Sequence, residues 1–203
     1  MSFHAVDWFT VGGSLGSAGA IFASIFVYKK QRENENNAYK KQKEREIRAL
    51  KLILKKECEL NYSSLEKLKE IILNLHSEKV DLTLRKGNFG YNYTFDFDRV
   101  KMSGRIPIFY INVMSSSLLT AARLDDEFFS KLEVALDVVS ELNHITNNII
   151  DYTLNKDEKT KVILRKLASY TSNRMEFFYN NLNELYIYCS GDSLTTQTKV
   201  LFK

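Results

Sequence analysis

Proline is almost absent from this sequence, with one residue in 203, and glycine is scarce, with eight. Four of those glycines fall between Gly12 and Gly19, so the rest of the chain has few of the residues that make tight turns. This scarcity argues against an all-β fold built from short strands. We therefore expect a mainly α-helical protein with long helices.

Cysteine is also rare, because Cys58 and Cys189 are the only two. They lie too far apart in the sequence for a zinc-binding spacing, and two residues make no disulfide framework. This usage is typical of a reducing compartment. We expect both to be buried or half-buried residues of helices.

Charge is missing from Trp8 to Tyr28, a run of 21 residues. As a helix, this run covers roughly 30 Å, the hydrocarbon thickness of a bilayer, so residues 1–28 are expected to form a transmembrane anchor. No basic residue precedes the run, unlike in a secretory signal peptide. Lys29 and Lys30 follow it. The positive-inside rule then predicts that the N-terminus lies outside the bacterial inner (plasma) membrane and that the remainder is cytoplasmic.

Small residues recur at every fourth position of this predicted span, so one helix face has almost no side-chain bulk. Such a face lets helices approach closely in lipid. It predicts a homo-oligomer or packing on the span of a partner complex. The face comprises Gly12, Gly16, Ala20 and Ser24.

Residues 29–46 are predicted to continue as a polar, basic juxtamembrane helix. From Lys29 to Lys56 the chain has eleven Lys or Arg residues and four Glu residues, a net charge of +7, whereas the whole chain carries only +4. Membrane lipids are the expected partner, because anionic headgroups attract basic side chains beside a span. Interleaved glutamates and a single aromatic residue, Tyr39, make direct nucleic-acid binding the less favoured alternative. The candidate headgroup contacts are Lys29, Lys30, Arg32, Lys40 and Lys41.

From Ile47 to Leu75, apolar residues recur at spacings of three and four, which predicts an amphipathic helix. Asn61 interrupts the apolar stripe. A polar residue at such a position can fix the register between packed elements.

Residues 80–114 lose the helical pattern and are predicted to form a small β insertion. Alternating residues flank Lys86–Asn88, a pattern that indicates a hairpin, and Ile106–Val113 is expected to be a third strand. The second strand places aromatic residues on one face. They either pack against helices, the interpretation we favour, or form a partner surface. They are Phe89, Tyr91, Tyr93, Phe95 and Phe97.

Two further helices are predicted, one starting near the acidic residues of 124–127 and one starting near 155–158 and ending at Gly191. With the helix from Ile47, they should form a cytoplasmic bundle over residues 47–191. Residues 192–203 are expected to be a polar, flexible tail.

The order of these parts resembles a class of small bacterial single-pass membrane proteins with a charged helix, a variable middle, an Asn/Ser-rich bend and a bundle-forming helix pair. The matching residues are Glu59–Asn61, Ser115–Ala122 and Leu142–Asn143. Some proteins of this class occur in phage-defence loci, for example as membrane effectors beside retron reverse transcriptases. The resemblance implies an antiviral role and carries over no catalytic residue.

No nucleophile with a base, paired carboxylates, zinc spacing or phosphate-binding loop stands out in the sequence. We therefore expect no catalytic residue, cofactor, metal or small-molecule substrate. The favoured hypothesis is a non-enzymatic membrane effector or toxin that acts through oligomerisation of its span and a cytoplasmic interaction bundle. The alternatives are a static membrane tether that recruits a cytoplasmic partner, and an enzyme with an unrecognised site.

Overall fold

The computed structural model describes residues 5–76, 81–97, 100–155 and 158–194, with side chains from Phe22 onward except beside the gaps. The chain divides into two compact units, residues 1–46 and residues 47–203.

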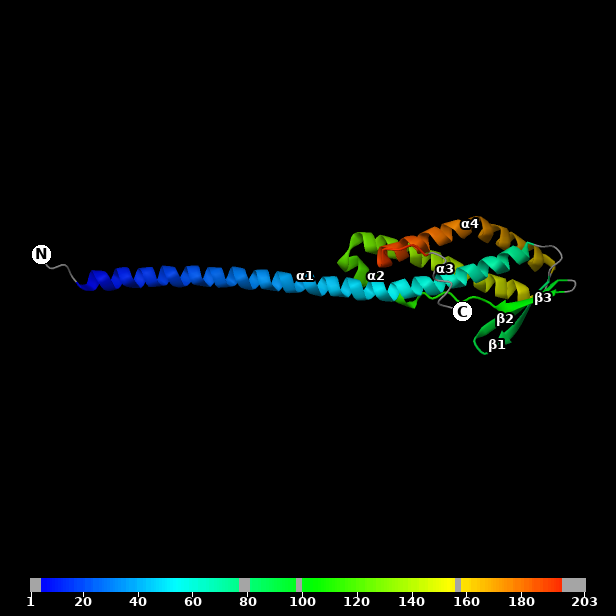
Figure 1. Ribbon diagram of the computed structural model, residues 1–203, viewed down its shortest axis with the longest axis horizontal. Coiled ribbons are helices and arrows are strands. Elements are labelled where there is room, and N and C mark those ends of the chain that lie inside the picture. The colour runs from blue at the N-terminus through cyan, green and yellow to red at the C-terminus, as the bar shows by residue number, and fades with distance from the viewer. Residues whose placement is uncertain (1–4, 77–80, 98–99, 156–157, 195–203) are drawn as a thin grey trace. The chain divides into compact units, whose positions relative to one another are not determined.

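The described chain is mainly helical and contains one small sheet, as the sequence predicts (Figure 1). Its helices are α1 (Ala5–Leu75), α2 (Asn112–Leu124), α3 (Asp126–Asn155) and α4 (Glu158–Ser190). Its strands are β1 (Asp81–Gly87), β2 (Gly90–Phe97) and β3 (Val100–Arg105). The second unit is a helical bundle formed by α2, α3, α4 and the part of α1 after Glu46.

The three strands form an antiparallel sheet in the order β1-β2-β3. The expected hairpin is present, and Gly90 closes its turn with a φ of 112°, a conformation that favours glycine. The prediction of a third strand at Ile106–Val113 is wrong, because β3 lies earlier in the chain. Pro107 has no N–H to donate to a ladder, and carbonyl groups of residues 108–110 bond to helix side chains instead.

The aromatic row of β2 is divided between the core and the surface. Tyr93 and Phe95 are buried, with 4% and 0% of their surface exposed, so they cannot belong to a partner surface. Phe89 is 73% exposed because it lies in the turn before β2 and not in the strand itself. Tyr91 is half-buried, and the side chain of Phe97 lies outside the described residues.

Gly104 of β3 lies opposite Tyr93 in the sheet register. A Cβ at Gly104 would approach the Tyr93 hydroxyl oxygen to 2.6 Å, so a larger residue would displace the ring. The glycine therefore lets Tyr93 cover β3 closely.

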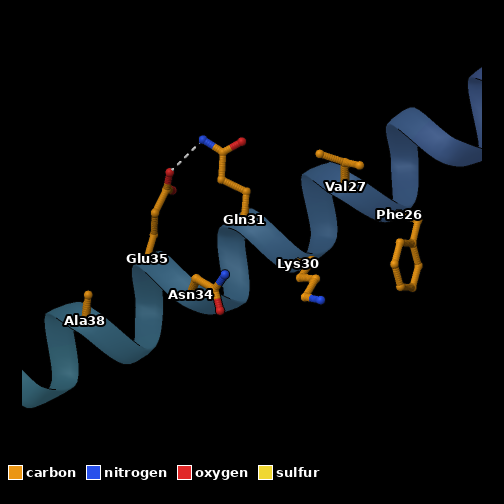
Figure 2. Close-up of a pocket in the computed structure, with 7 residues that line it drawn as sticks. All are labelled: Phe26, Val27, Lys30, Gln31, Asn34, Glu35 and Ala38. Atoms are coloured by element: carbon orange, nitrogen blue, oxygen red, sulfur yellow. Dashed lines mark hydrogen bonds between the residues drawn. The ribbon is translucent and has the colours of Figure 1, made fainter.

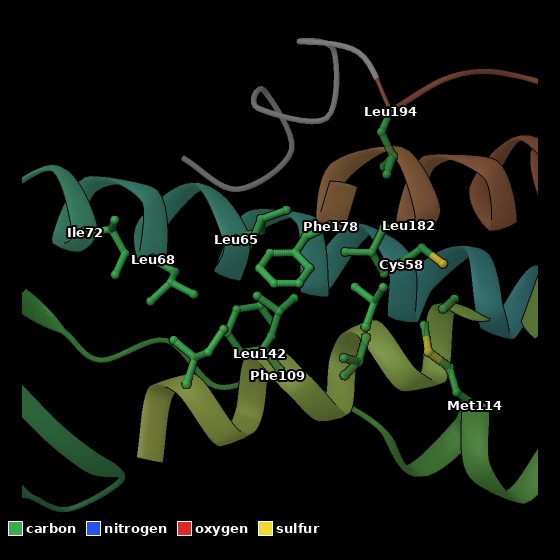
Figure 3. Packing of buried hydrophobic residues seen from close by; sticks show 14 of the residues in the cluster. Cys58, Leu65, Leu68, Ile72, Phe109, Met114, Leu142, Phe178, Leu182 and Leu194 are labelled. Carbon is green, nitrogen blue, oxygen red and sulfur yellow. The ribbon is translucent and has the colours of Figure 1, made fainter. Parts of the chain in front are cut away.

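Residues 106–111, which we call the strap, join β3 to α2 and are held by side chains of helices. The Asn61 amide donates to the Tyr110 carbonyl (2.8 Å) and accepts from the Tyr110 N–H (2.7 Å). The Ser64 hydroxyl donates to the Ile108 carbonyl at 2.7 Å. Phe109 of the strap lies in the core beside Leu142 (Figure 3). Asn61 thus fixes the position of a chain segment, not the register between two helices.

Helix α2 occupies Ser115–Ala122, where the resemblance implies an Asn/Ser-rich bend. Its own N-cap position, Ile111, supplies no side-chain hydrogen bond. The Glu57 carboxylate of α1 accepts from the backbone N–H groups of Val113 (3.0 Å) and Met114 (2.8 Å) instead. Burial raises the pKa of Glu57, and the two N–H groups oppose that rise. The helix start is therefore capped from a distant part of the chain.

The bundle core contains the predicted apolar faces of α1, α3 and α4 (Figure 3). Cys58 is buried and Cys189 is half-buried, as expected, and both are free thiols. The fully buried members of the core include Leu54, Leu68, Ile72, Phe128, Leu132, Leu142, Ile145, Ile149 and Phe178.

The ends of the last two helices follow the sequence signals. Asp125 caps α3 by accepting from the Phe128 N–H at 2.8 Å. Gly191, at a φ of 81°, ends α4 and donates its N–H to the Ile187 carbonyl at 2.8 Å. Leu194, expected in a flexible tail, is instead 1% exposed, because its backbone is bonded to Asn183 and Tyr179. Residues 195–203 lie outside the described part of the chain.

Replacing Asn61 with alanine tests whether the strap depends on this side chain. The variant loses two hydrogen bonds and leaves the Tyr110 N–H and carbonyl unpaired, so we expect about 2 kcal/mol of destabilisation in chemical unfolding. Asn147→Ala, at an exposed position of α3, is the matched control and should change stability by less than about 0.5 kcal/mol. Equal stability of the two variants would contradict the assigned role.

Candidate functional site

The part of α1 between Phe22 and Glu46 is the candidate contact site of the first unit. The first turns with described side chains carry exposed apolar residues. Phe22, Phe26 and Tyr28 are 74%, 67% and 63% exposed. Ile25 and Val27 are exposed too. Apolar side chains crowded on one exposed segment indicate a contact surface.

The chemistry of this helix changes within two turns, as Figure 2 shows. Phe26 and Val27 precede Lys30 and Gln31, and the Gln31 amide donates to the Glu35 carboxylate at 3.1 Å. The shallow hollow between these residues is lined by this helix alone. It is therefore an open surface and not a cavity that could enclose a ligand.

The predicted site residues of the first unit all lie on α1, but side chains are described only from Phe22 onward. Ser24 and the basic residues Lys29, Lys30, Arg32, Lys40 and Lys41 lie on α1, and all are exposed. Gly12, Gly16 and Ala20 also lie on α1, in the part before Phe22 where only the backbone is described. Within the part of the chain that the structure describes, no helix is long and apolar enough to cross a bilayer.

A second group of charged and aromatic residues lies where α1 meets the start of α3 and the end of α4. The Lys51 ammonium is 3.8 Å from the centre of the Tyr188 ring, and the Tyr188 hydroxyl donates to the Asp125 carboxylate at 3.0 Å. Burial and the Asp125 contact raise the pKa of Tyr188 to about 12. Hydrogen bonds lower the pKa of Asp125, that from the Phe128 N–H above all. Sequence reasoning missed this group because its members are far apart in the chain.

A third group joins α3 to α4. The Arg174 guanidinium bonds to the Glu141 carboxylate at 2.9 Å and lies 4.6 Å from the centre of the Phe177 ring. Tyr170 donates to the same carboxylate, and this bond is the main cause of its raised pKa. These contacts connect α3 to α4, and their geometry fits a structural role in holding the two helices together. Among the described residues, no three His, Cys, Asp or Glu side chains gather as a metal site.

The raised pKa of Tyr188 predicts how stability depends on pH. A folded-state pKa above the ordinary value of 10 adds stability that is complete below pH 10 and is lost as pH rises through about 12. Tyr188→Phe removes this titration, so its unfolding free energy should fall less steeply than that of the wild type between pH 10 and 12. Denaturant unfolding at several pH values measures the difference. Tyr39→Phe, in the exposed part of α1, is the control, and its unfolding free energy should follow that of the wild type. If the unfolding free energy of Tyr188→Phe also falls in parallel with that of the wild type, the effect is excluded.

Searches against protein-family models, curated proteins and solved structures found no match to this chain.

Proposed function

We propose that the chain is a non-enzymatic protein of the bacterial inner membrane, anchored by residues 8–28 and acting through self-association of that anchor and a cytoplasmic interaction bundle. The observation that carries the proposal is the exposed apolar segment of α1, which continues the uncharged run of the sequence and is followed directly by exposed basic residues.

The exposed apolar side chains support membrane contact because water is a poor environment for them. Phe22, Phe26 and Val27 are each more than half exposed. Lys29 and Lys30 follow on the same helix, where lysines favour the headgroup level of the cytoplasmic leaflet. Each basic residue close to an anionic surface contributes about 1 kcal/mol.

The second unit supports an interaction role. It has a core of helices and a small sheet. Three of its buried polar residues, Glu57, Asn61 and Ser64, bond to the backbone of other segments, so folding explains these hydrogen bonds. A role in antiviral defence rests on the resemblance of Glu59–Asn61 and Leu142–Asn143 to membrane effectors.

The basic residues should set the orientation. A reporter that is active only in the cytoplasm, fused after Lys203, should be active in the wild type. Changing Lys29, Lys30 and Arg32 to glutamine should lower that activity several-fold, because the orientation bias weakens. Changing Lys55, Lys56 and Arg48 to glutamine removes the same charge farther along α1 and should have little effect. Loss of activity in both triple variants alike would contradict the assigned orientation.

The small-residue face should control self-association. Gly16→Ile places a branched side chain on the face that includes Gly12 and Ala20, so it should reduce cross-linked oligomers in membranes at least several-fold and relieve any toxicity of overexpression. Ala18→Ile adds a branched side chain about 160° around the helix from Gly16, on the opposite face, and is the matched control. If both variants associate like the wild type, the effector hypothesis fails.

A static tether is the second candidate function, favoured by the well-packed second unit. It predicts that an unrelated membrane span in place of residues 8–28 preserves function in full. The effector hypothesis predicts loss of function in the same exchange, so a complementation assay separates the two.

A further inference from the structure

A groove of about 470 Å³ runs between α1 and α4 in the second unit. Its centre is aromatic, since the Tyr62 and Tyr179 rings lie 5.6 Å apart. Leu65 and Met175 add apolar surface. Its charged groups are Glu66 and Lys69 from α1 and Glu176 from α4, so acidic groups outnumber basic ones.

The chain after α4 runs toward this groove. After Gly191 the chain turns back, so that Leu194 lies beside Asn183 and Tyr179, which are two to three turns before the end of α4. The Leu194 N–H donates to the side-chain amide oxygen of Asn183 (Oδ1) at 2.7 Å, and the Leu194 carbonyl accepts from the Tyr179 hydroxyl at 3.0 Å. The segment therefore runs back along α4 and arrives at Tyr179, which lines the groove.

The residues that follow have a chemistry that matches the groove. Residues 195–203 read TTQTKVLFK, with three apolar residues between Lys199 and Lys203. Apolar side chains suit the Tyr62, Leu65 and Met175 surface, and the two lysines complement the excess of carboxylates.

The reach of the segment is sufficient. Tyr179 and Ser172 lie seven residues apart on α4, which is about 10 Å along a helix. Seven residues also separate Leu194 from Leu201. They cover about 10 Å as a helix and at most about 23 Å when extended, so Leu201 can reach Ser172.

We propose that residues 195–203 of this chain dock in the groove between α1 and α4, with Val200–Phe202 against its apolar surface. The groove is then an intramolecular docking site, and any partner segment that uses it must first displace these residues. The inference rests on the second unit alone and does not depend on membrane attachment.

Disulfide trapping in the full-length chain tests the proposal. Cys189→Ser removes the half-buried thiol, whereas Cys58 is fully buried. In that background, Ser172→Cys with Leu201→Cys places one thiol in the groove. Asn173→Cys with Leu201→Cys is the matched control, because Asn173 is the next residue of α4, is exposed and does not line the groove.

After oxidation with copper phenanthroline, we expect the intramolecular 172–201 disulfide at least about fivefold more often than the 173–201 disulfide, with yields normalised to maleimide labelling rates. An undocked segment presents Leu201→Cys to both positions at the same effective concentration, so it would give nearly equal yields. Adding Glu176→Lys should lower the 172–201 yield about threefold. Near-equal yields, no disulfide at either position, or a 172–201 disulfide between two chains would each overturn the proposal, the last assigning the groove to a second copy. Unchanged circular dichroism confirms that the variants are folded.

Discussion

The second unit depends on the hydrogen bonds that three polar residues of α1 make to the strap and to the start of α2. Glu57, Asn61 and Ser64 lie on one face of α1, at spacings of four and three residues. Together they bond to backbone groups of residues 108, 110, 113 and 114, which no strand or helix partner satisfies. Buried backbone groups without partners are costly, so these side chains decide where the sheet ends and where α2 begins.

The parts of the fold that could be predicted from sequence are those whose signals are local. Helical periodicity, the alternation in β2, Asp125 as a cap and Gly191 as a stop all act within a few residues of their effect. The strand expected at Ile106–Val113, and the bend that the resemblance implies at Ser115–Ala122, are not formed for the opposite reason. Glu57 caps α2 from 56 residues away, and Asn61 replaces a strand partner from 49 residues away. No window of sequence around residues 106–122 contains either group.

The same distinction applies to the candidate sites. The apolar and basic segments of α1 are continuous in sequence, so the basic positions and the apolar run before them could be identified in advance. The contact between Lys51, Tyr188 and Asp125 and the groove between α1 and α4 each combine helices that are far apart in the chain. Tyr62 and Tyr179 follow the helical pattern as ordinary core-facing residues. Only their tertiary contact shows that they line a groove.

The described parts of the two units differ in how much apolar surface they bury. The second unit buries its own core, including Phe128, Phe178 and Leu142. Between Phe22 and Glu46, α1 has no buried residue, and its described side-chain bonds, such as Gln31 to Glu35 and Gln42 to Glu46, are exposed pairs within the helix. Such pairs contribute only about 0.2–0.5 kcal/mol each, and most helical stability in proteins comes from packing. The exposed apolar residues at the start of this described part, such as Phe22 and Phe26, are the side chains that the proposed membrane contact would cover.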